Sequence, residues 1–340
     1  MKVLIIGEKN WHGRWTEATL DAFSKISQAE IFFYKEDSRN IFLRGRNYLR
    51  RKNKQFDTLY SKLFGNSSEL ISLVKKNKFD LVLILKGGDI KEEILSELKK
   101  YVPILANWWV DDPFNQDANI NLHKYYDYFF VFDSSYIPQL KNLGVKNAYW
   151  LPCAFSPLNY FAGEANPKYL TDLAFVASYF PPREELFRHL TNEKLDISIW
   201  GPNWDKAPLQ SFFKLYPNAI RGLNLPNSEA ASLYRSAKIC LNLHFTHSKL
   251  DGINQRMLEI IASGGFQLCD FREGFSNIFE DKKEIVYYYD PKEIPELVDF
   301  YLNNESERKK IIQTGMKKVL SEHSFDSRAK EILRIIQNVD

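Results

Sequence analysis

Short apolar runs alternate with helix-like stretches along most of the chain, and this alternation constrains the fold more than any other feature. In the first half, the apolar runs lie at residues 3–6, 31–34, 81–85, 104–106, 129–132 and 148–151. Most are continuously apolar, as expected for strands whose sheet is covered on both faces. Because helix-like segments separate them, the pattern predicts βαβ units around a parallel sheet.

A second series of the same kind follows a stretch rich in Pro and Gly at residues 152–167. Its apolar runs lie at residues 173–177, 197–200, 239–243, 266–269 and 285–288. A chain of 340 residues is long enough for two domains of about 100–200 residues each. The sequence therefore predicts two doubly wound, Rossmann-like α/β domains that face a central cleft. We expect them at residues 1–152 and 168–322, with a C-terminal helix at 323–340 packing back on the first domain.

Composition excludes several other classes of protein. The 46 basic and 43 acidic residues nearly balance, which argues against a dedicated nucleic-acid-binding protein. The three cysteines are widely spaced, which argues against a disulfide scaffold or a cysteine-built zinc site and favours a reducing compartment. No apolar run approaches the ~20 residues that span a bilayer, and the first run is too short for a signal peptide. We expect a cytoplasmic protein.

The most informative stretch runs from His244 to Gly265, where a buried strand leads into a polar loop and then a helix. We expect the helix to begin near Gly252 or Ile253, so that its free N–H groups make an anion site. Asp251 and Glu259 are about 12 Å apart along an ideal helix, comparable to the distance from a sugar across a diphosphate to a ribose. The alternative is that Asp251 is only an N-cap and that Glu259 forms only a surface ion pair with Arg256.

This stretch resembles the acidic E-x7-E element of retaining nucleotide-sugar glycosyltransferases with the GT-B fold. More closely, it resembles the N-x-R-x-x-E-x-x-A-x-G-G pattern of the CgeB-type (spore-maturation-protein-like) family, although its first acid is Asp251 rather than Glu. The resemblance implies that a sugar moves from a nucleoside diphosphate sugar to an acceptor hydroxyl, that Glu259 binds the ribose and that Asp251 binds the sugar. The donor-binding residues that we predict are Ser178, Arg183, Gly201, His244, Asp251, Gly252, Ile253, Asn254, Arg256 and Glu259.

Other donor-side elements follow in the order that the resemblance implies. Ser178 ends a strand and Arg183 falls in the first turn after two prolines, similar to the family's strand, turn and basic residue that grips the diphosphate. The alternative is an ion pair between Arg183 and Glu184 or Glu185. Gly201 ends the next strand with a glycine turn.

In the first domain, the loop that contains Trp11, His12 and Gly13 follows the first strand and resembles the family's acceptor-side loop. It is no G-x-G-x-x-G fingerprint, which disfavours a dinucleotide cofactor. The segment from Trp109 through Asp111 and Asp112 resembles the family's W-x-x-D-x-P loop, and tryptophan with carboxylates is typical of sugar binding; the alternative is that an aspartate only caps a helix.

The acidic spacing favours a retaining reaction, in which the leaving phosphate accepts the acceptor's proton. If the reaction inverts the anomeric configuration, it requires a base, for which Asp111, Asp112 and His12 are the candidates. We predict no cofactor and no obligatory metal, because the pair His244 and His247 has no clear third ligand nearby.

A basic stretch from Lys35 to Lys54 carries eight cations, two acids and interleaved apolar residues. It could lie on the inner face of an anionic membrane or bind a lipid-linked acceptor, or it could be a solvated flank. For the acceptor, we expect a glycan, a lipid-linked molecule or a protein in cell-surface glycan or glycoconjugate synthesis. Two other functions stay open, a sugar-nucleotide epimerase with the same fold and a non-catalytic membrane-surface or scaffold module.

Overall fold

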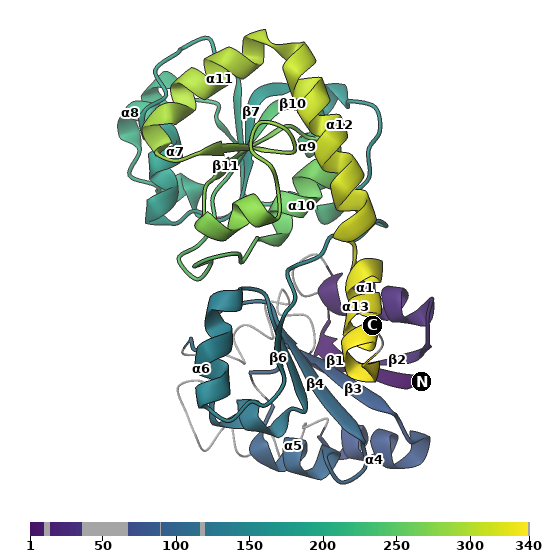
Figure 1. The fold of residues 1–340 in the computed structure, drawn as a ribbon. Coiled ribbons are helices and arrows are strands. Elements are labelled where there is room, and N and C mark those ends of the chain that lie inside the picture. The colour runs from purple at the N-terminus through teal and green to yellow at the C-terminus, as the bar shows by residue number, and fades with distance from the viewer. Residues whose placement is uncertain (10–13, 36–66, 89, 116–119, 339–340) are drawn as a thin grey trace. The chain divides into compact units, whose positions relative to one another are not determined.

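The computed structural model describes residues 1–9, 14–35, 67–88, 90–115 and 120–338, and the chain divides into two compact units (Figure 1). Unit 1 comprises Met1–Pro152 together with Arg328–Asp340, and unit 2 comprises Cys153–Ser327. The C-terminal helix α13 (Phe325–Gln337) thus ends in unit 1, where Arg328 Nε donates to the carbonyl of Pro152 at 2.9 Å.

Within the described residues, unit 1 contains one sheet of six parallel strands in the order β2-β1-β3-β4-β5-β6. The strands are β1 (Lys2–Glu8), β2 (Gln28–Lys35), β3 (Leu81–Leu85), β4 (Ile104–Trp109), β5 (Tyr128–Val131) and β6 (Ala148–Trp150). The described α-helices that connect them are α1 (Trp15–Ser24), α4 (Ser67–Asn77), α5 (Glu92–Leu98) and α6 (Ile137–Asn142). All five residues of β3 are buried, which explains why this strand is continuously apolar.

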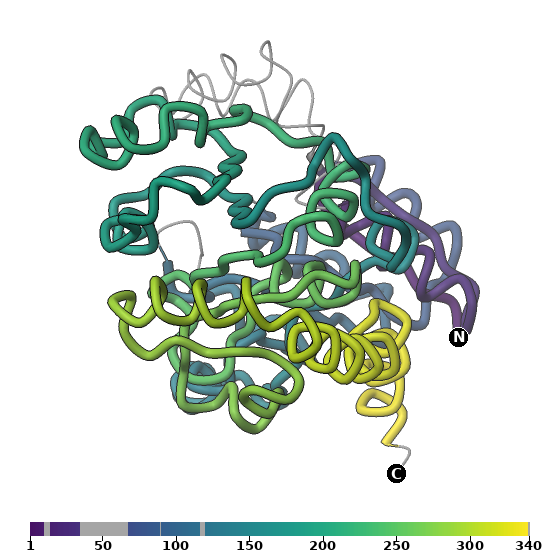
Figure 2. Tube along the Cα trace, turned by 90° about the horizontal axis from the view of Figure 1, so that it is seen from above, coloured from purple at the N-terminus to yellow at the C-terminus, as the bar shows by residue number. Residues whose placement is uncertain are grey.

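Unit 2 contains a second parallel sheet in the order β12-β11-β10-β7-β8-β9. Its strands are β7 (Thr171–Val176), β8 (Ile197–Trp200), β9 (Ile220–Gly222), β10 (Ala237–Asn242), β11 (Gln267–Asp270) and β12 (Val286–Tyr288). Its helices are α7 (Glu185–Arg188), α8 (Gln210–Leu215), α9 (Asn227–Ser236), α10 (Gln255–Ala262), α11 (Ile294–Asn303) and α12 (Glu305–Glu322). Figure 2 follows the chain from α11 into the longer α12.

Successive residues of one strand pack on opposite faces of the sheet in unit 2. Leu173 and Phe175 of β7 join a core cluster with α7, α8 and α11, whereas Ala174 joins a second cluster with α9 and α10. Each face of the sheet therefore has its own apolar core, and the predicted doubly wound α/β fold is confirmed. Among the described residues, no helix combines the length and the apolar character needed to cross a bilayer.

Two elements of unit 2 escaped the sequence prediction, the edge strand β9 and the short helix α8. β9 has only three residues, none of them buried, so it lacks the apolar run that marks the other strands. A third difference is the start of α10. It begins at Gln255 rather than near Gly252 or Ile253, because the backbone of Asn254 is extended and its side chain caps the helix by accepting from the amide of Met257.

Candidate functional site

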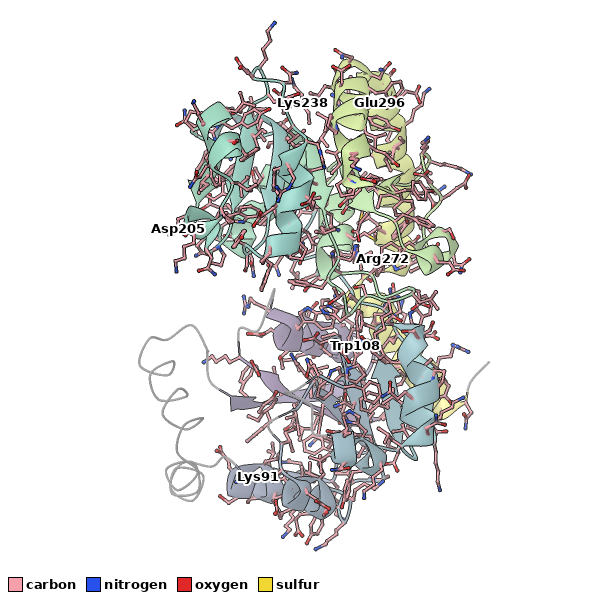
Figure 3. All side chains as sticks on the ribbon, turned by 90° about the vertical axis from the view of Figure 1, so that its left-hand side faces the viewer. Lys91, Trp108, Asp205, Lys238, Arg272 and Glu296 are labelled. Carbon is pink, nitrogen blue, oxygen red and sulfur yellow. The ribbon has the colours of Figure 1, made fainter. Side chains whose placement is uncertain are left out.

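The strand order of unit 2 reverses between β7 and β10, which are adjacent in the middle of the sheet. In open parallel sheets, ligands bind beyond the carboxyl ends of the strands at such a reversal. In Figure 3, Lys238 marks the end of the sheet where β10 starts, and Arg272 marks the end just past β11. The carboxyl ends of the strands lie at the end marked by Arg272. Arg183 follows β7 and the loop from residue 243 to 254 follows β10, so the fold brings the two predicted donor-binding segments to one edge.

Arg183 lies in the 3-10 turn η5 (Pro181–Glu184) and is only 4% exposed. Its guanidinium lies between aromatic rings, with the ring centroids of Phe245, Phe180 and Phe175 at 4.7, 5.3 and 5.7 Å. It donates a hydrogen bond to the carbonyl of Ser178. The cation is thus held by the backbone of the loop after β7 and by Phe245, three residues past the end of β10.

The carboxylates next to Arg183 in sequence do not neutralise it. Glu184 and Glu185 instead pair with Arg188, at 3.3 and 2.8 Å, so the alternative of a local ion pair is wrong. Across the described ranges, Arg183 has no carboxylate within ion-pair distance. Burial and the nearby charge of Arg256 lower the pKa of Arg183 to about 9, which still leaves it charged at neutral pH.

Arg256, in the first turn of α10, is the second cation of the site. Its guanidinium donates to the Oδ1 of Asn242 at 3.2 Å. Asn242 and Asn254 exchange two side-chain hydrogen bonds, each of 3.1 Å, and Asn254 caps α10 by accepting from the amide of Met257 at 2.8 Å. The end of β10 and the start of α10 are therefore joined through the residue that orients Arg256.

Glu259 lies in the second turn of α10 and is 8% exposed. Burial raises the pKa of Glu259 to about 7, against the opposing effects of Arg256 and of a hydrogen bond from Tyr160. This environment excludes an exposed ion pair. A buried carboxyl that is ionised near neutral pH can accept hydrogen bonds from hydroxyl groups.

The residues before α10 differ in their surroundings. Gly252 and Ile253 are buried and precede the helix, and Asp251 is half-buried in the loop. Because Asn254 is the N-cap, Asp251 does not cap the helix as the alternative required. We expected the backbone N–H groups of Gly252 and Ile253 to be the first of α10, but they belong to the loop. The free N–H groups of the first helical turn begin at Gln255.

Gly201 and Ser178 shape the backbone at this edge. Gly201 has φ of +143°, and a Cβ there would lie 2.0 Å from the carbonyl oxygen of Ala177. Only glycine allows the end of β8 to approach the end of β7 this closely. Gly201 therefore has a packing role that is sufficient to explain it, while Ser178 contributes its carbonyl to Arg183.

His244 forms a buried pair with Asp270, the last residue of β11. The Nδ1 of His244 lies 2.8 Å from the Oδ1 of Asp270, which also accepts from the backbone amide of His244 at 2.8 Å. The sequence analysis did not select Asp270. Asp270 could have been predicted, because it is an acidic residue at the end of a buried strand, on the same edge of the sheet as the other candidates.

In unit 1, Asp111 and Asp112 follow β4 at the carboxyl edge of the sheet. Asp111 forms an ion pair with Lys86, with 2.9 Å between the charged atoms. Lys86 lies just past β3 and has a left-handed backbone, with φ of +60°. Asp112 accepts from the amide of Phe114 at 2.8 Å and from the hydroxyl of Tyr136. Asp112 is thus engaged in local structure, but it caps a turn at residues 113–114 rather than a helix as the alternative required.

Trp109, predicted as an acceptor-side residue, does not present its ring. It is 2% exposed and packs against His123 and Phe129, because β4 is covered on both faces like its neighbours. Trp11, His12 and Gly13 lie outside the described residues, as does the basic stretch beyond Lys35.

Comparison with known proteins agrees with this architecture. Residues 183–334 match a family model described as glycosyl transferase-like. Over 279 residues the chain is 23% identical to spore protein CgeB of Bacillus subtilis (strain 168), an alignment that covers 78% of this chain and 86% of that protein.

Solved structures match the whole chain. HepE of Anabaena, in a complex with UDP, has a TM-score of 0.65 at 10% identity, with 100% of both chains covered. Sucrose-phosphate synthase of Thermosynechococcus elongatus has a TM-score of 0.69 at 10% identity, with 99% of this chain and 98% of that chain covered. These matches confirm the predicted GT-B fold and the family resemblance.

Proposed function

We propose that this chain, a glycosyltransferase of the GT-B type similar to CgeB over most of its length, takes its sugar from a nucleoside diphosphate sugar. The observation that carries the proposal is Arg183, a buried cation that lies beside a second cation and has no carboxylate partner in the described part of the chain. A buried charge without a counter-ion costs several kcal/mol. A diphosphate, which carries two negative charges, supplies the counter-ion that the protein itself does not.

The neighbouring groups suit the rest of such a donor. We assign Glu259, buried one helical turn from Arg256, to the ribose hydroxyls, and Asp251 to hydroxyls of the sugar. HepE, which shares the fold, has been solved with UDP and with UDP-glucose, and this supports the same class of donor here. A ligand screen identifies the base and the sugar that the chain prefers.

In the reaction that we propose, the bond between the sugar and the diphosphate breaks as the acceptor hydroxyl attacks. Negative charge develops on the leaving diphosphate, where Arg183 and Arg256 stabilise it. We propose retention of anomeric configuration without a metal, the acceptor's proton passing to the leaving phosphate. If the product is inverted, the candidate bases are Asp111, which pairs with Lys86, Asp112, which accepts from Phe114 and Tyr136, and His12. As acceptor we propose a hydroxyl of a cell-surface glycan or glycoconjugate.

The test is a thermal-shift and calorimetry screen with UDP, GDP, dTDP, ADP and CMP. A diphosphate at 100 times its Kd should stabilise the protein by about 2.7 kcal/mol, whereas CMP should bind much more weakly. Arg183→Met should lose the shift, because each hydrogen bond between a charged group and phosphate is worth about 1.5–3 kcal/mol. Without ligand, the variant should be as stable as the wild type or more stable, since it removes an uncompensated buried charge.

Arg188→Met is the matched control, because Arg188 is five residues away, half-exposed and paired with Glu184 and Glu185. It should keep the ligand-induced shift. If no diphosphate binds the wild type, or if both variants bind equally well, the proposed donor site is wrong. With the identified donor, NMR of the anomeric proton in the product and an assay in EDTA then test retention and metal independence.

A further inference from the structure

His244 and Asp270 form a rigid pair at the ligand-binding edge of unit 2. Asp270 Oδ1 accepts both from the backbone amide and from the imidazole of His244, each at 2.8 Å. Two bonds to one carboxylate oxygen fix the position of the loop after β10 and the orientation of the ring. They also place a hydrogen on Nδ1, so that the second ring nitrogen, Nε2, is left for another partner.

That second nitrogen is buried and has no hydrogen-bond partner among the residues that the structure describes, and the His244 side chain has no exposed surface. Leaving a buried polar atom unsatisfied costs about 1–3 kcal/mol. Few such atoms occur in folded proteins, and each calls for a physical explanation such as a missing ligand. Nε2 can accept a hydrogen bond when the ring is neutral and can donate one when it is protonated.

The carboxylate of the pair is surrounded by a cation, a thiol and an aromatic ring. Arg272 lies 3.2 Å from the Oδ2 of Asp270, the Cys269 thiol lies 3.6 Å from Nδ1, and Phe275 packs on the ring at 4.6 Å. Burial raises the pKa of Cys269, so the thiol is neutral. Burial acts to raise the pKa of Asp270 as well, but His244 and Arg272 outweigh it and the pKa is lowered. The carboxylate is therefore ionised and lies beside the imidazole as a fixed negative charge.

His244 also belongs to the segment that holds both arginines. Asn242, two residues earlier, accepts from Arg256 at 3.2 Å, and Phe245, the next residue, lies 4.7 Å from the guanidinium of Arg183. The segment that carries His244 is therefore in contact with both arginines.

Resting on the proposed function, we propose that His244, positioned by Asp270, is a third cationic group of the diphosphate site. When a nucleoside diphosphate binds, the imidazole takes up one proton from solvent at Nε2 and donates that N–H to a phosphate oxygen. Asp270 is the positioning residue, since it acts through the ring. The same N–H then faces the oxygen on which charge develops when the sugar leaves.

A metal site is the competing interpretation, because ligand atoms of His244, Cys269 and Asp270 all lie within 4.8 Å of one another. Two observations oppose it. Asp270 Oδ1 already accepts two hydrogen bonds, and one of them comes from Nδ1, the ring nitrogen that lies 3.6 Å from the thiol. The cluster is therefore a hydrogen-bonded pair with a neutral thiol beside it.

The test is calorimetry of UDP binding at pH 8, where the free diphosphate is fully ionised, in buffers of different ionisation enthalpy. If another diphosphate of the screen binds more tightly, it replaces UDP as the probe. The wild type should take up protons on binding, up to one per ligand. His244→Gln should abolish the uptake and weaken binding by about 10-fold or more. Asp270→Asn should reduce both, and thermal melts without ligand identify any variant that fails to fold.

His247→Gln is the control, because it changes a histidine of the same loop, stacked on Phe245, and should keep the proton uptake. Binding by the wild type without proton uptake, or uptake unchanged in His244→Gln, would overturn the inference and leave the proposed donor intact. A stoichiometric metal in the purified wild type that is lost in His244→Gln would overturn it in favour of a metal site. Absence of binding by every diphosphate would instead refute the proposed function itself.

Discussion

The hydroxyl of Tyr160 donates a hydrogen bond to the buried carboxyl group of Glu259. Tyr160 comes from the segment before β7 and stacks on Tyr234 of α9, with ring centroids 6.4 Å apart. Arg256 in turn interacts with the hydroxyl of Tyr234. Two tyrosines therefore connect the predicted ribose-binding acid with one of the two cations of the site.

The first prediction concerns the pH dependence of stability. The pKa of Glu259 is about 7 in the folded protein, above about 4.3 for an unfolded chain, so the folded state holds the proton more tightly. Its contribution to the free energy of unfolding therefore falls as pH rises from about 4 to about 7, and then levels off. Glu259→Gln should remove this decline. Chemical unfolding between pH 5 and pH 8 measures it, and Glu296→Gln, an exposed change on α11, controls for the lost charge.

The second prediction separates Tyr160 from Glu259. The hydrogen bond from Tyr160 lowers the pKa of Glu259, so Tyr160→Phe should move it further above 7. The pH at which the decline in stability ends should then shift upward in the same unfolding series. An unchanged pH profile in Tyr160→Phe would show that the two side chains are not coupled.

The third prediction uses the cap of α10. Asn254→Ala should cost about 1 kcal/mol, because it removes the N-cap oxygen, and it should also weaken diphosphate binding, because Asn242 loses the partner that orients it toward Arg256. Asn254→Ser keeps a capping oxygen but is too short to reach Asn242. It should therefore keep most of the stability and still bind more weakly. Equal affinity of Asn254→Ser and wild type would contradict the orienting role.

The fourth prediction concerns Gly201. A Cβ there would lie 2.0 Å from the backbone of Ala177, and φ is +143°, so Gly201→Ala should destabilise unit 2 by about 3 kcal/mol or more. Gly264→Ala is the control. Gly264 also has a positive φ, of +82°, but its nearest atom is at an ordinary 3.7 Å, so the cost should be only about 1–2 kcal/mol of backbone strain. Similar melting temperatures for the two variants would argue against the close approach.

Much of the fold could be predicted from the sequence, because most strands are continuously apolar runs, buried on both faces. β9 could not, since its Arg221 and Gly222 lie at a sheet edge where burial imposes no pattern. Trp109 was misjudged because an aromatic residue beside carboxylates resembles a sugar site, whereas β4 is covered on both faces and its ring is buried like that of Trp108. That no described carboxylate pairs with Arg183, and that Asp270 pairs with His244, depends on side-chain directions that spacing along the chain does not determine.

The two arginines are supported by β7 and β10, which are neighbours at the centre of the sheet. Each of these strands is flanked by others, so local opening that begins at the outermost strands, β9 and β12, reaches the central pair last. Local unfolding of the outer strands therefore leaves the distance between the two arginines unchanged. Substitutions in the outer strands are expected to lower the resistance of unit 2 to proteolysis well before they alter the selection of ligands.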